Sequence, residues 1–261
     1  MALGTVKKIN LLIRGHIRNS FNDDKLIALV RHFAENYDLT IFIHTWSVVQ
    51  NKLSWRHMEE ISSEVDEKLI RSYFKEFDQL IKTLIIDDDK KIKIYGNTEG
   101  NIGRTPCPVL AWKNMYYGKL RLINAASGLT GPDEVAVQTR FDLMSNNFSP
   151  DKREIFEFLN NNYDPIFNDD REERIRFLRM HCFLGMDNIY MASISNMQIF
   201  IKYMYFQMDR ILRVHESTFH QEHISFHERK WAFENPENIH VIDEFHSNIK
   251  TTHEIVSDDP T

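Results

Sequence analysis

Short runs of apolar residues alternate with amphipathic stretches at the start of the chain. Residues 9–13 form a nearly continuous apolar run, which is typical of a strand buried on both faces. Residues 24–36 carry leucine, valine and phenylalanine at helical spacing, and residues 39–43 form a second apolar run. A strand, a helix and a second strand in this order predict a parallel sheet, and hence an α/β fold.

The rest of the chain continues this alternation and is expected to become more helical after its midpoint. We expect helical material over 54–77, strands over 80–86 and 92–95, a loop over 96–106, a helix over 108–126 and a short strand over 135–137. Farther on we expect helices over 152–160, 171–180, 189–213 and 222–233, a strand over 239–242 and a fraying end over 251–261. Because no internal repeat or clear linker is present, residues 1–261 are predicted to form one domain.

The strand over 135–137 leads into two charged residues, Arg140 and Asp142, two positions apart. Open α/β sheets bind their ligands at the carboxyl ends of the strands. Because alternate residues of a strand share a face, both side chains are expected to point into one crevice, where Asp142 would hold a divalent cation. The alternative is an exposed ion pair at a strand end.

Two further strand ends carry residues suited to a nucleotide or a sugar. After the first strand, Gly15 lets a ligand approach the backbone, and Arg14 and Arg18 can chelate phosphate oxygens. The spacing is neither a P-loop nor a dinucleotide fingerprint, which disfavours a kinase or a Rossmann dehydrogenase. After the second strand, His44 precedes Trp46, whose indole could stack on a base or a sugar. The alternatives are a surface turn with solvated arginines and a rim aromatic that covers the core.

Other candidates lie farther along the chain. Most of the apolar stripe of the helix over 108–126 is expected to be core, and Lys113 and Lys119 are its candidates for phosphate contact. Asp187 is expected just before the helix over 189–213, where it would cap the helix or take a proton from an acceptor hydroxyl. The acidic triplet at 87–89 is expected to be a solvated turn rather than a metal site.

Histidines gather near the predicted helix over 222–233. His220, His223 and His227 lie close to Glu222, and His223 and His227 are four residues apart on one helical face, which can bind a metal. The pattern is not His-Glu-x-x-His, so a zinc protease is not indicated. One histidine that helps to hold a catalytic cation is the functional interpretation, and surface histidines are the alternative.

Composition narrows the class of protein. The 261 residues carry a formal net charge of -6 with a pI of about 6.1, whereas a general nucleic-acid binder would normally be strongly basic. Cys107 and Cys182 are too few for a disulfide framework, residues 1–8 lack the apolar core of a signal peptide, and no uncharged apolar window is long enough to span a membrane. We therefore expect a cytoplasmic protein that binds no nucleic acid. Arginines between 171 and 179 leave open a peripheral contact with the inner membrane or with an anionic lipid-linked acceptor.

Taken in order, these segments resemble bacterial glycosyltransferases of the GT-A type that build capsule, O-antigen or lipopolysaccharide glycans. The similar segments are residues 9–20, 41–46, 116–143, 187–194 and 219–224. The segment 140–142 looks like the arginine-x-aspartate form that replaces the usual Asp-x-Asp metal motif in some of these families, and it keeps only one carboxylate. Asp187 and Asn188 resemble the acceptor-side carboxylate element, and His220 with Glu222 resembles a late His-x-Glu element near the donor.

The resemblance implies a GT-A-like fold, with a Rossmann-like, mostly parallel sheet flanked by helices. Residues 1–145 would form the nucleotide-sugar-binding half, and residues 146–261 a more variable, largely helical acceptor half. It further implies a nucleotide-sugar donor, with a UDP-sugar favoured, and a hydroxyl of a growing, lipid-linked glycan as the acceptor. A divalent cation, manganese or magnesium, would be held by Asp142 and His220.

The residues expected to contact the donor are Arg14, Gly15, Arg18, His44, Trp46, Lys119, Arg140 and Asp142. Asn188 and Glu222 are expected on the acceptor side. If transfer inverts the configuration of the sugar, Asp187 would act as the general base, and if transfer retains it, Asp187 would only bind the acceptor. The alternatives are a metal-dependent nucleotidyltransferase or hydrolase of nucleotide sugars, and a non-catalytic subunit that binds glycan or nucleotide.

Overall fold

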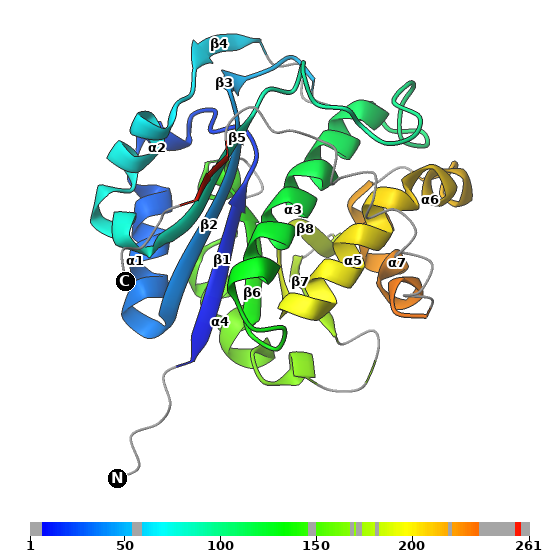
Figure 1. Ribbon diagram of the computed structural model, residues 1–261. Coiled ribbons are helices and arrows are strands. Elements are labelled where there is room, and N and C mark those ends of the chain that lie inside the picture. The colour runs from blue at the N-terminus through cyan, green and yellow to red at the C-terminus, as the bar shows by residue number, and fades with distance from the viewer. Residues whose placement is uncertain are drawn as a thin grey trace.

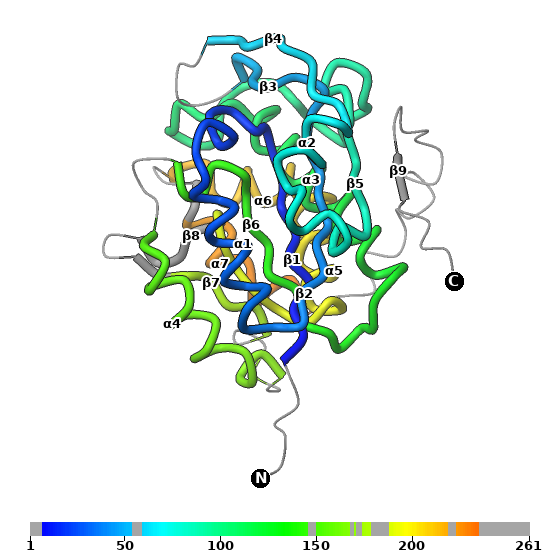
Figure 2. The backbone as a smooth tube through the Cα atoms, turned by 90° about the vertical axis from the view of Figure 1, so that its left-hand side faces the viewer, coloured from blue at the N-terminus to red at the C-terminus, as the bar shows by residue number. Residues whose placement is uncertain are grey.

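The computed structural model describes residues 7–53, 59–145, 150–167, 170, 174–180, 183–218, 221–234 and 254–256. Its main sheet has the strand order β7-β8-β6-β1-β2-β5-β9 (Figure 1). These strands are β1 (Lys8–Arg14), β2 (Asp38–Trp46), β5 (Ile81–Asp87), β6 (Val135–Arg140), β7 (Ile175–Met180), β8 (Phe183–Ser193) and β9 (Glu254–Val256). A small two-stranded antiparallel sheet, β3 (Val48–Gln50) with β4 (Ile61–Glu64), lies at the carboxyl end of the parallel strands (Figures 1 and 2).

The four central strands, β6, β1, β2 and β5, are parallel, and antiparallel strands flank them on both sides. From β1 the chain passes through helix α1 (Lys25–Asn36) to β2 on one side, whereas β6 pairs with β1 on the other side. The strand order therefore reverses between β1 and β6. In open α/β sheets, the carboxyl ends of the two strands at such a switch point border the ligand site.

Helices cover both faces of the sheet, which explains the continuous apolar run of β1. Leu11 and Ile13 pack with the apolar residues of α1, while Leu12 packs on the opposite face with the long helix α3 (Val109–Leu129). Figure 1 shows α1 on one side of the sheet and α3 with α5 (Ile194–Phe206) on the other. The predicted α/β fold, with a mostly parallel sheet flanked by helices, is confirmed, and the sheet is mixed because antiparallel strands lie at both edges.

Further helices complete the described structure. They are α2 (Glu67–Tyr73), α4 (Lys152–Asn162), α6 (Met208–Val214), α7 (Gln221–Ala232) and the 3-10 turns η1 (Ser20–Asn22), η2 (Lys75–Leu80), η3 (Phe141–Met144) and η4 (Pro165–Phe167). A capping box fixes the start of α4, because Asp151 accepts from the backbone of Glu154, whose side chain accepts in turn from the backbone of Asp151. Within the described residues, no helix is both long and apolar enough to cross a bilayer.

The predicted helix over 171–180 is wrong where the structure describes it, because residues 175–180 form β7. Ile175 and Phe177 are buried, while Arg176 between them is half-exposed. This two-residue period is that of a strand, so Arg176 does not lie on the helical basic face that was expected here.

The predicted helix over 189–213 begins too early. Residues 189–193 belong to β8, and α5 begins at Ile194 after Ser193, whose Oγ accepts from the backbone N–H of Asn196 at 3.2 Å. Residues 189–192 are all buried against the two faces of the sheet in alternation, and periodicity does not separate such a run from a buried helix. Asp187 consequently lies inside β8, so the predicted helix cap at this residue is wrong.

Four smaller predictions have mixed outcomes. Residues 92–95 form no strand, although Ile92, Ile94 and Tyr95 pack against the core. The described part of 54–77 contains β4 as well as helix α2. Residues 254–256, expected to fray, pair with β5 as the antiparallel strand β9. The strand predicted over 239–242 lies outside the described residues.

The contact between α3 and the sheet is close enough to test by adding one methyl group. A Cβ at Gly118 would come within 2.8 Å of His44 Nδ1, and the His44 ring is fully buried. We expect Gly118→Ala to lower the free energy of unfolding by about 1–3 kcal/mol, despite the better helix propensity of alanine. Urea denaturation measures this change.

Gly128→Ala is the matched control, because a Cβ at Gly128 in the same helix meets nothing within 4 Å. This variant should be neutral or stabilised by up to about 1 kcal/mol. Equal unfolding free energies for the two variants would contradict the close packing of α3 on His44.

Candidate functional site

Three strand ends bring polar residues into one row at the carboxyl edge of the sheet. Arg14, the last residue of β1, is in register with Arg140 at the end of β6 and with His44 on β2. Parallel neighbours in register lie on the same face, so these side chains start from adjacent positions on the α3 side of the sheet. The edge thus carries two arginines at the switch point.

The turn after β1 brings a third arginine to this edge. Gly15 has φ +96°, a left-handed conformation that glycine adopts without strain, and its carbonyl accepts from the hydroxyl of Thr45 at 3.0 Å. Arg18 also has a positive φ, +50°, and its backbone N–H donates to the carbonyl of Val49 at 3.0 Å. A non-glycine residue held in this region is typical of a functional turn.

Arg18 and Arg140 converge on Asp142, which lies in η3 directly after β6. Arg18 Nη1 donates to Asp142 Oδ2 at 2.5 Å, and Arg140 Nη2 donates to the same oxygen at 2.5 Å. Arg140 Nε donates to the other oxygen, Oδ1, and Arg140 Nη1 donates to Asn188 Oδ1 on β8 at 2.9 Å. We call Arg18, Arg140 and Asp142 the arginine cluster.

The carboxylate of this cluster is covered, while its two guanidiniums are accessible. The side chain of Asp142 is 5% exposed, against 16% for Arg18 and 18% for Arg140. Burial alone raises the pKa of the Asp142 carboxyl, but the guanidiniums of Arg140 and Arg18 outweigh it and hold that pKa well below its usual range. With two guanidiniums and one carboxylate, the cluster is net positive, and both guanidiniums are partly exposed.

His16, which sequence reasoning missed, adds a neutral ring to this edge. Its ring lies against Trp46, with the centroids 5.8 Å apart. Burial, then the charges of Arg18 and His44, lowers the pKa of His16 to about 3, so the ring is uncharged at neutral pH. The one signal in the sequence is its place inside the Arg-Gly-x-x-Arg turn, between the two arginines.

Asp87 was also missed, because the acidic triplet was expected to be solvated. Asp87 is 1% exposed at the end of β5, and its Oδ2 lies 3.2 Å from His44 Nε2 and 3.3 Å from Arg121 Nε. Burial raises the pKa of Asp87, but the hydrogen bond and charge of His44 and the charge of Arg121 leave it lowered overall. Asp88 and Asp89 remain half-exposed, as a turn would have them.

Two predicted donor contacts, His44 and Trp46, belong to the core instead. His44 is fully buried, and Trp46 is buried and stacks on Tyr117 with the ring centroids 6.0 Å apart. The indole is therefore packed on protein side chains, as in the alternative in which it covers the core. Both side chains are enclosed by the protein and offer no surface to a base or a sugar.

Lys119 packs in the core, and the structure describes Asp187 by its backbone alone. Lys119 is fully buried in α3, with its Nζ 4.1 Å from the centroid of the Tyr116 ring and 5.1 Å from that of Tyr190. Asp187 is placed by its backbone in β8, next to Asn188, and its side chain lies outside the described part of the structure. Of the predicted acceptor-side residues, Asn188 is the one seen to contact the cluster.

The donor set at this edge does not fit a divalent cation. Both oxygens of Asp142 accept hydrogen bonds from guanidiniums, and no group of three or more metal-ligating residues occurs among the residues described. The other predicted metal ligand, His220, and the side chain of Glu222 lie outside the described residues. Cations near phosphate sites need anionic or neutral oxygen ligands, and this edge supplies mainly guanidiniums.

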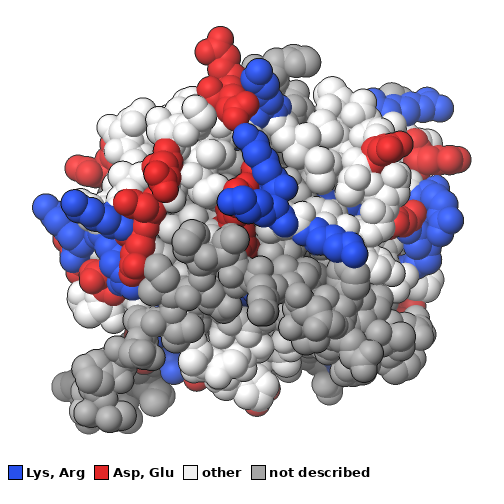
Figure 3. Space-filling model, turned by 45° about the horizontal axis from the view of Figure 1, so that its top comes forward, with Lys and Arg blue, Asp and Glu red and all other residues white. Residues whose placement is uncertain are grey.

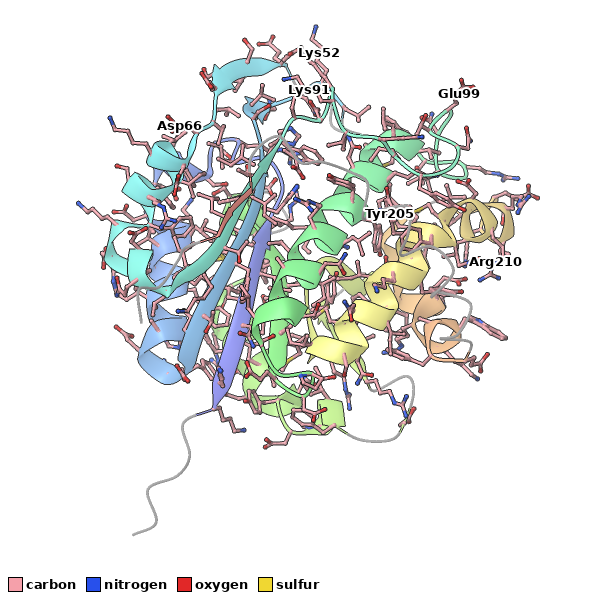
Figure 4. The ribbon with its side chains drawn as sticks, in the orientation of Figure 1. Lys52, Asp66, Lys91, Glu99, Tyr205 and Arg210 are labelled. Atoms are coloured by element: carbon pink, nitrogen blue, oxygen red, sulfur yellow. The ribbon has the colours of Figure 1, made fainter. Side chains whose placement is uncertain are left out.

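Basic side chains also gather on the surface at this end of the molecule. Figure 3 shows Lys and Arg side chains running across the middle of this end, and Lys52 and Lys91, both exposed, lie there as well (Figure 4). Acidic side chains lie beside them in the same view, so this end of the molecule carries both signs of charge. Comparisons with protein-family models, with curated proteins and with solved structures gave no match to this chain.

Proposed function

We propose that this protein is a glycosyltransferase that moves a sugar from a nucleotide-sugar donor to a hydroxyl of a lipid-linked bacterial surface polysaccharide. The observation that carries the proposal is a pair of partly exposed guanidiniums, those of Arg18 in the turn after β1 and of Arg140 at the carboxyl end of β6. Ligands of open α/β sheets bind at such a switch point, and guanidiniums bind phosphate in bidentate fashion. The GT-A form of the α/β fold is part of the same proposal and is supported by the order of the similar segments.

In this reaction the acceptor oxygen bonds to the anomeric carbon, and the bond from that carbon to the diphosphate oxygen breaks. Negative charge grows on the leaving nucleoside diphosphate as the electron pair moves onto its oxygen. Arg18 and Arg140, fixed in advance by Asp142, would stabilise that charge without reorganising. His16 stays neutral beside them and adds no charge of its own.

The acceptor side of the proposal rests on β8, the strand next to β6. Asn188 accepts from Arg140 and so joins β8 to the diphosphate site. If the reaction inverts configuration, Asp187, its neighbour in β8, is the proposed base that takes the acceptor proton. If the reaction retains configuration, no base is needed in that place and Asp187 contributes to acceptor binding.

The test is the release of nucleoside diphosphate from a panel of nucleotide sugars, measured with and without a lipid-linked glycan pool. We expect release from one donor that requires the acceptor, with the sugar recovered on the glycan. A thermal-shift screen selects that donor first, since a ligand at ~100 times its dissociation constant adds roughly 2.7 kcal/mol of stability.

Two outcomes would contradict the proposal, and each would favour a different function. Release of free sugar at the same rate without acceptor would indicate a hydrolase of nucleotide sugars. Donor binding without turnover on any acceptor pool would indicate a binding subunit.

A further inference from the structure

Asp142 is the residue for which the sequence predicts a metal, and the structure surrounds it with cations. Arg140 bonds both of its oxygens, and Arg18 bonds one of them. A divalent cation on this carboxylate would therefore sit against two guanidiniums, and like charges at such short distances repel strongly.

The burial of the Asp142 carboxylate and its arginine neighbours also argue against a bound metal ion. The side chain of Asp142 is almost fully covered, so a cation would have to displace an arginine to reach the carboxylate. Arg14, whose Cα is in register with that of Arg140, is buried at the same edge, and its charge acts on His44. The pKa of Asp142 is lowered because the charges and hydrogen bonds of Arg140 and Arg18 overcome the effect of burial.

Arg140 is held from two directions, which fixes the plane of its guanidinium. Its Nε and Nη2 donate to Asp142, and its Nη1 donates to Asn188 Oδ1 at 2.9 Å. The backbone of Arg18 is fixed as well, in a left-handed conformation with its N–H on Val49. A guanidinium with a fixed plane matches two oxygens of a phosphate better than a flexible cation does.

We propose that the arginine cluster binds the diphosphate of the donor without a divalent cation, and that Asp142 is a positioning residue that orients Arg18 and Arg140. This inference rests on the proposed function and specifies how the donor is held. Guanidiniums then supply the positive charge that a metal supplies at an Asp-x-Asp site, and the remaining carboxylate serves to aim them. The ligand chemistry is a pyrophosphate group with tetrahedral oxyanions.

Calorimetry with inorganic pyrophosphate tests this without assuming which donor is natural. Pyrophosphate is titrated into the full chain in EDTA, and manganese chloride is titrated separately into the chain alone. We expect pyrophosphate to bind in EDTA. We expect manganese not to bind at Asp142, so any manganese binding by the parent chain should persist in Asp142→Asn. In Arg140→Gln we expect pyrophosphate affinity to fall about tenfold or more, as for loss of a charge-assisted hydrogen bond.

Asp142→Asn separates positioning from ligation and from a merely structural role. The arginines remain in this variant, so its pyrophosphate affinity in EDTA should stay within about tenfold of the parent. Its kcat for transfer, per folded molecule, should fall about a hundredfold with little change in the donor KM, because misaimed guanidiniums lose charge stabilisation in the transition state. An unchanged kcat per folded molecule would assign Asp142 a structural role only.

The wild-type titration alone decides the metal question, even if a variant fails to fold. Pyrophosphate binding that requires manganese would overturn the metal-free site while leaving a glycosyltransferase in place. Binding of neither pyrophosphate nor UDP, with or without manganese, would overturn the site and the proposed function together. Acceptor-dependent transfer that continues in EDTA would support both.

Discussion

Replacing Arg140 by glutamine should lower the rate of sugar transfer by roughly a hundred- to a thousandfold. Removing one preorganised donor that faces developing negative charge typically costs this much in kcat. Glutamine keeps part of the polar side chain but has neither the charge nor the planar fork. The measurement is kcat in the acceptor-dependent release assay, per folded molecule, with Arg18→Gln expected to behave in the same way.

Arg31→Gln is the matched control for these variants. Arg31 also pairs with a carboxylate, Glu76, at 2.7 Å, but on the exposed surface of α1, away from the switch point. Exposed pairs of this kind contribute little, so neither turnover nor stability should change appreciably. Near-parental turnover of Arg140→Gln, or an equal loss in Arg31→Gln, would remove the guanidinium from the mechanism.

Replacing Asp142 by alanine should lower the free energy of unfolding by about 3 kcal/mol at neutral pH. Breaking a buried ion pair leaves its partners uncompensated, and the partial exposure of Arg18 and Arg140 places this loss at the lower end of the usual range. Urea denaturation at neutral pH measures the loss. Asp164→Ala, which removes a surface partner of Lys7, is the control and should cost ~1 kcal/mol or less.

The same variant has a predictable dependence on pH. The folded-state pKa of Asp142 lies below its unfolded value, about 3.9. The ionised carboxylate therefore stabilises the folded state above about pH 4, and this stabilisation is lost as the pH falls from there toward the folded-state pKa. The gap in stability between the parent and Asp142→Ala should therefore narrow below about pH 4. A constant gap over this range, or no gap at neutral pH, would contradict the buried ion pairs.

The central sheet could be predicted from the sequence because its strands carry their own signal. Buried parallel strands are short, continuous apolar runs, and each ends in polar residues such as Arg14 and Arg140. The errors fell where the same signal is ambiguous, in residues 189–193, whose apolar run suits a helix equally well. Only pairing with β6 decides that this run is a strand.

The sequence predicted which residues lie at the candidate site better than it predicted what those residues do there. Arg14, Arg18 and Arg140 follow strand ends that topology brings together. The metal role of Asp142 was inferred from local spacing, whereas its actual partner Arg18 is 124 residues away in the chain. The local pattern around a carboxylate does not reveal that a guanidinium far away in the chain will form an ion pair with it. The pairing of Asp87 with Arg121 of α3 was missed for the same reason.

The central claim is that Arg18, in the turn after β1, and Arg140, at the end of β6, hold the diphosphate of the donor. A crystal structure of the chain with UDP tests it most directly. The account predicts phosphate oxygens within hydrogen-bonding distance of the guanidiniums of Arg18 and Arg140, with Asp142 still paired to them. UDP bound elsewhere, or joined to Asp142 through a metal ion with the arginines turned away, would contradict it.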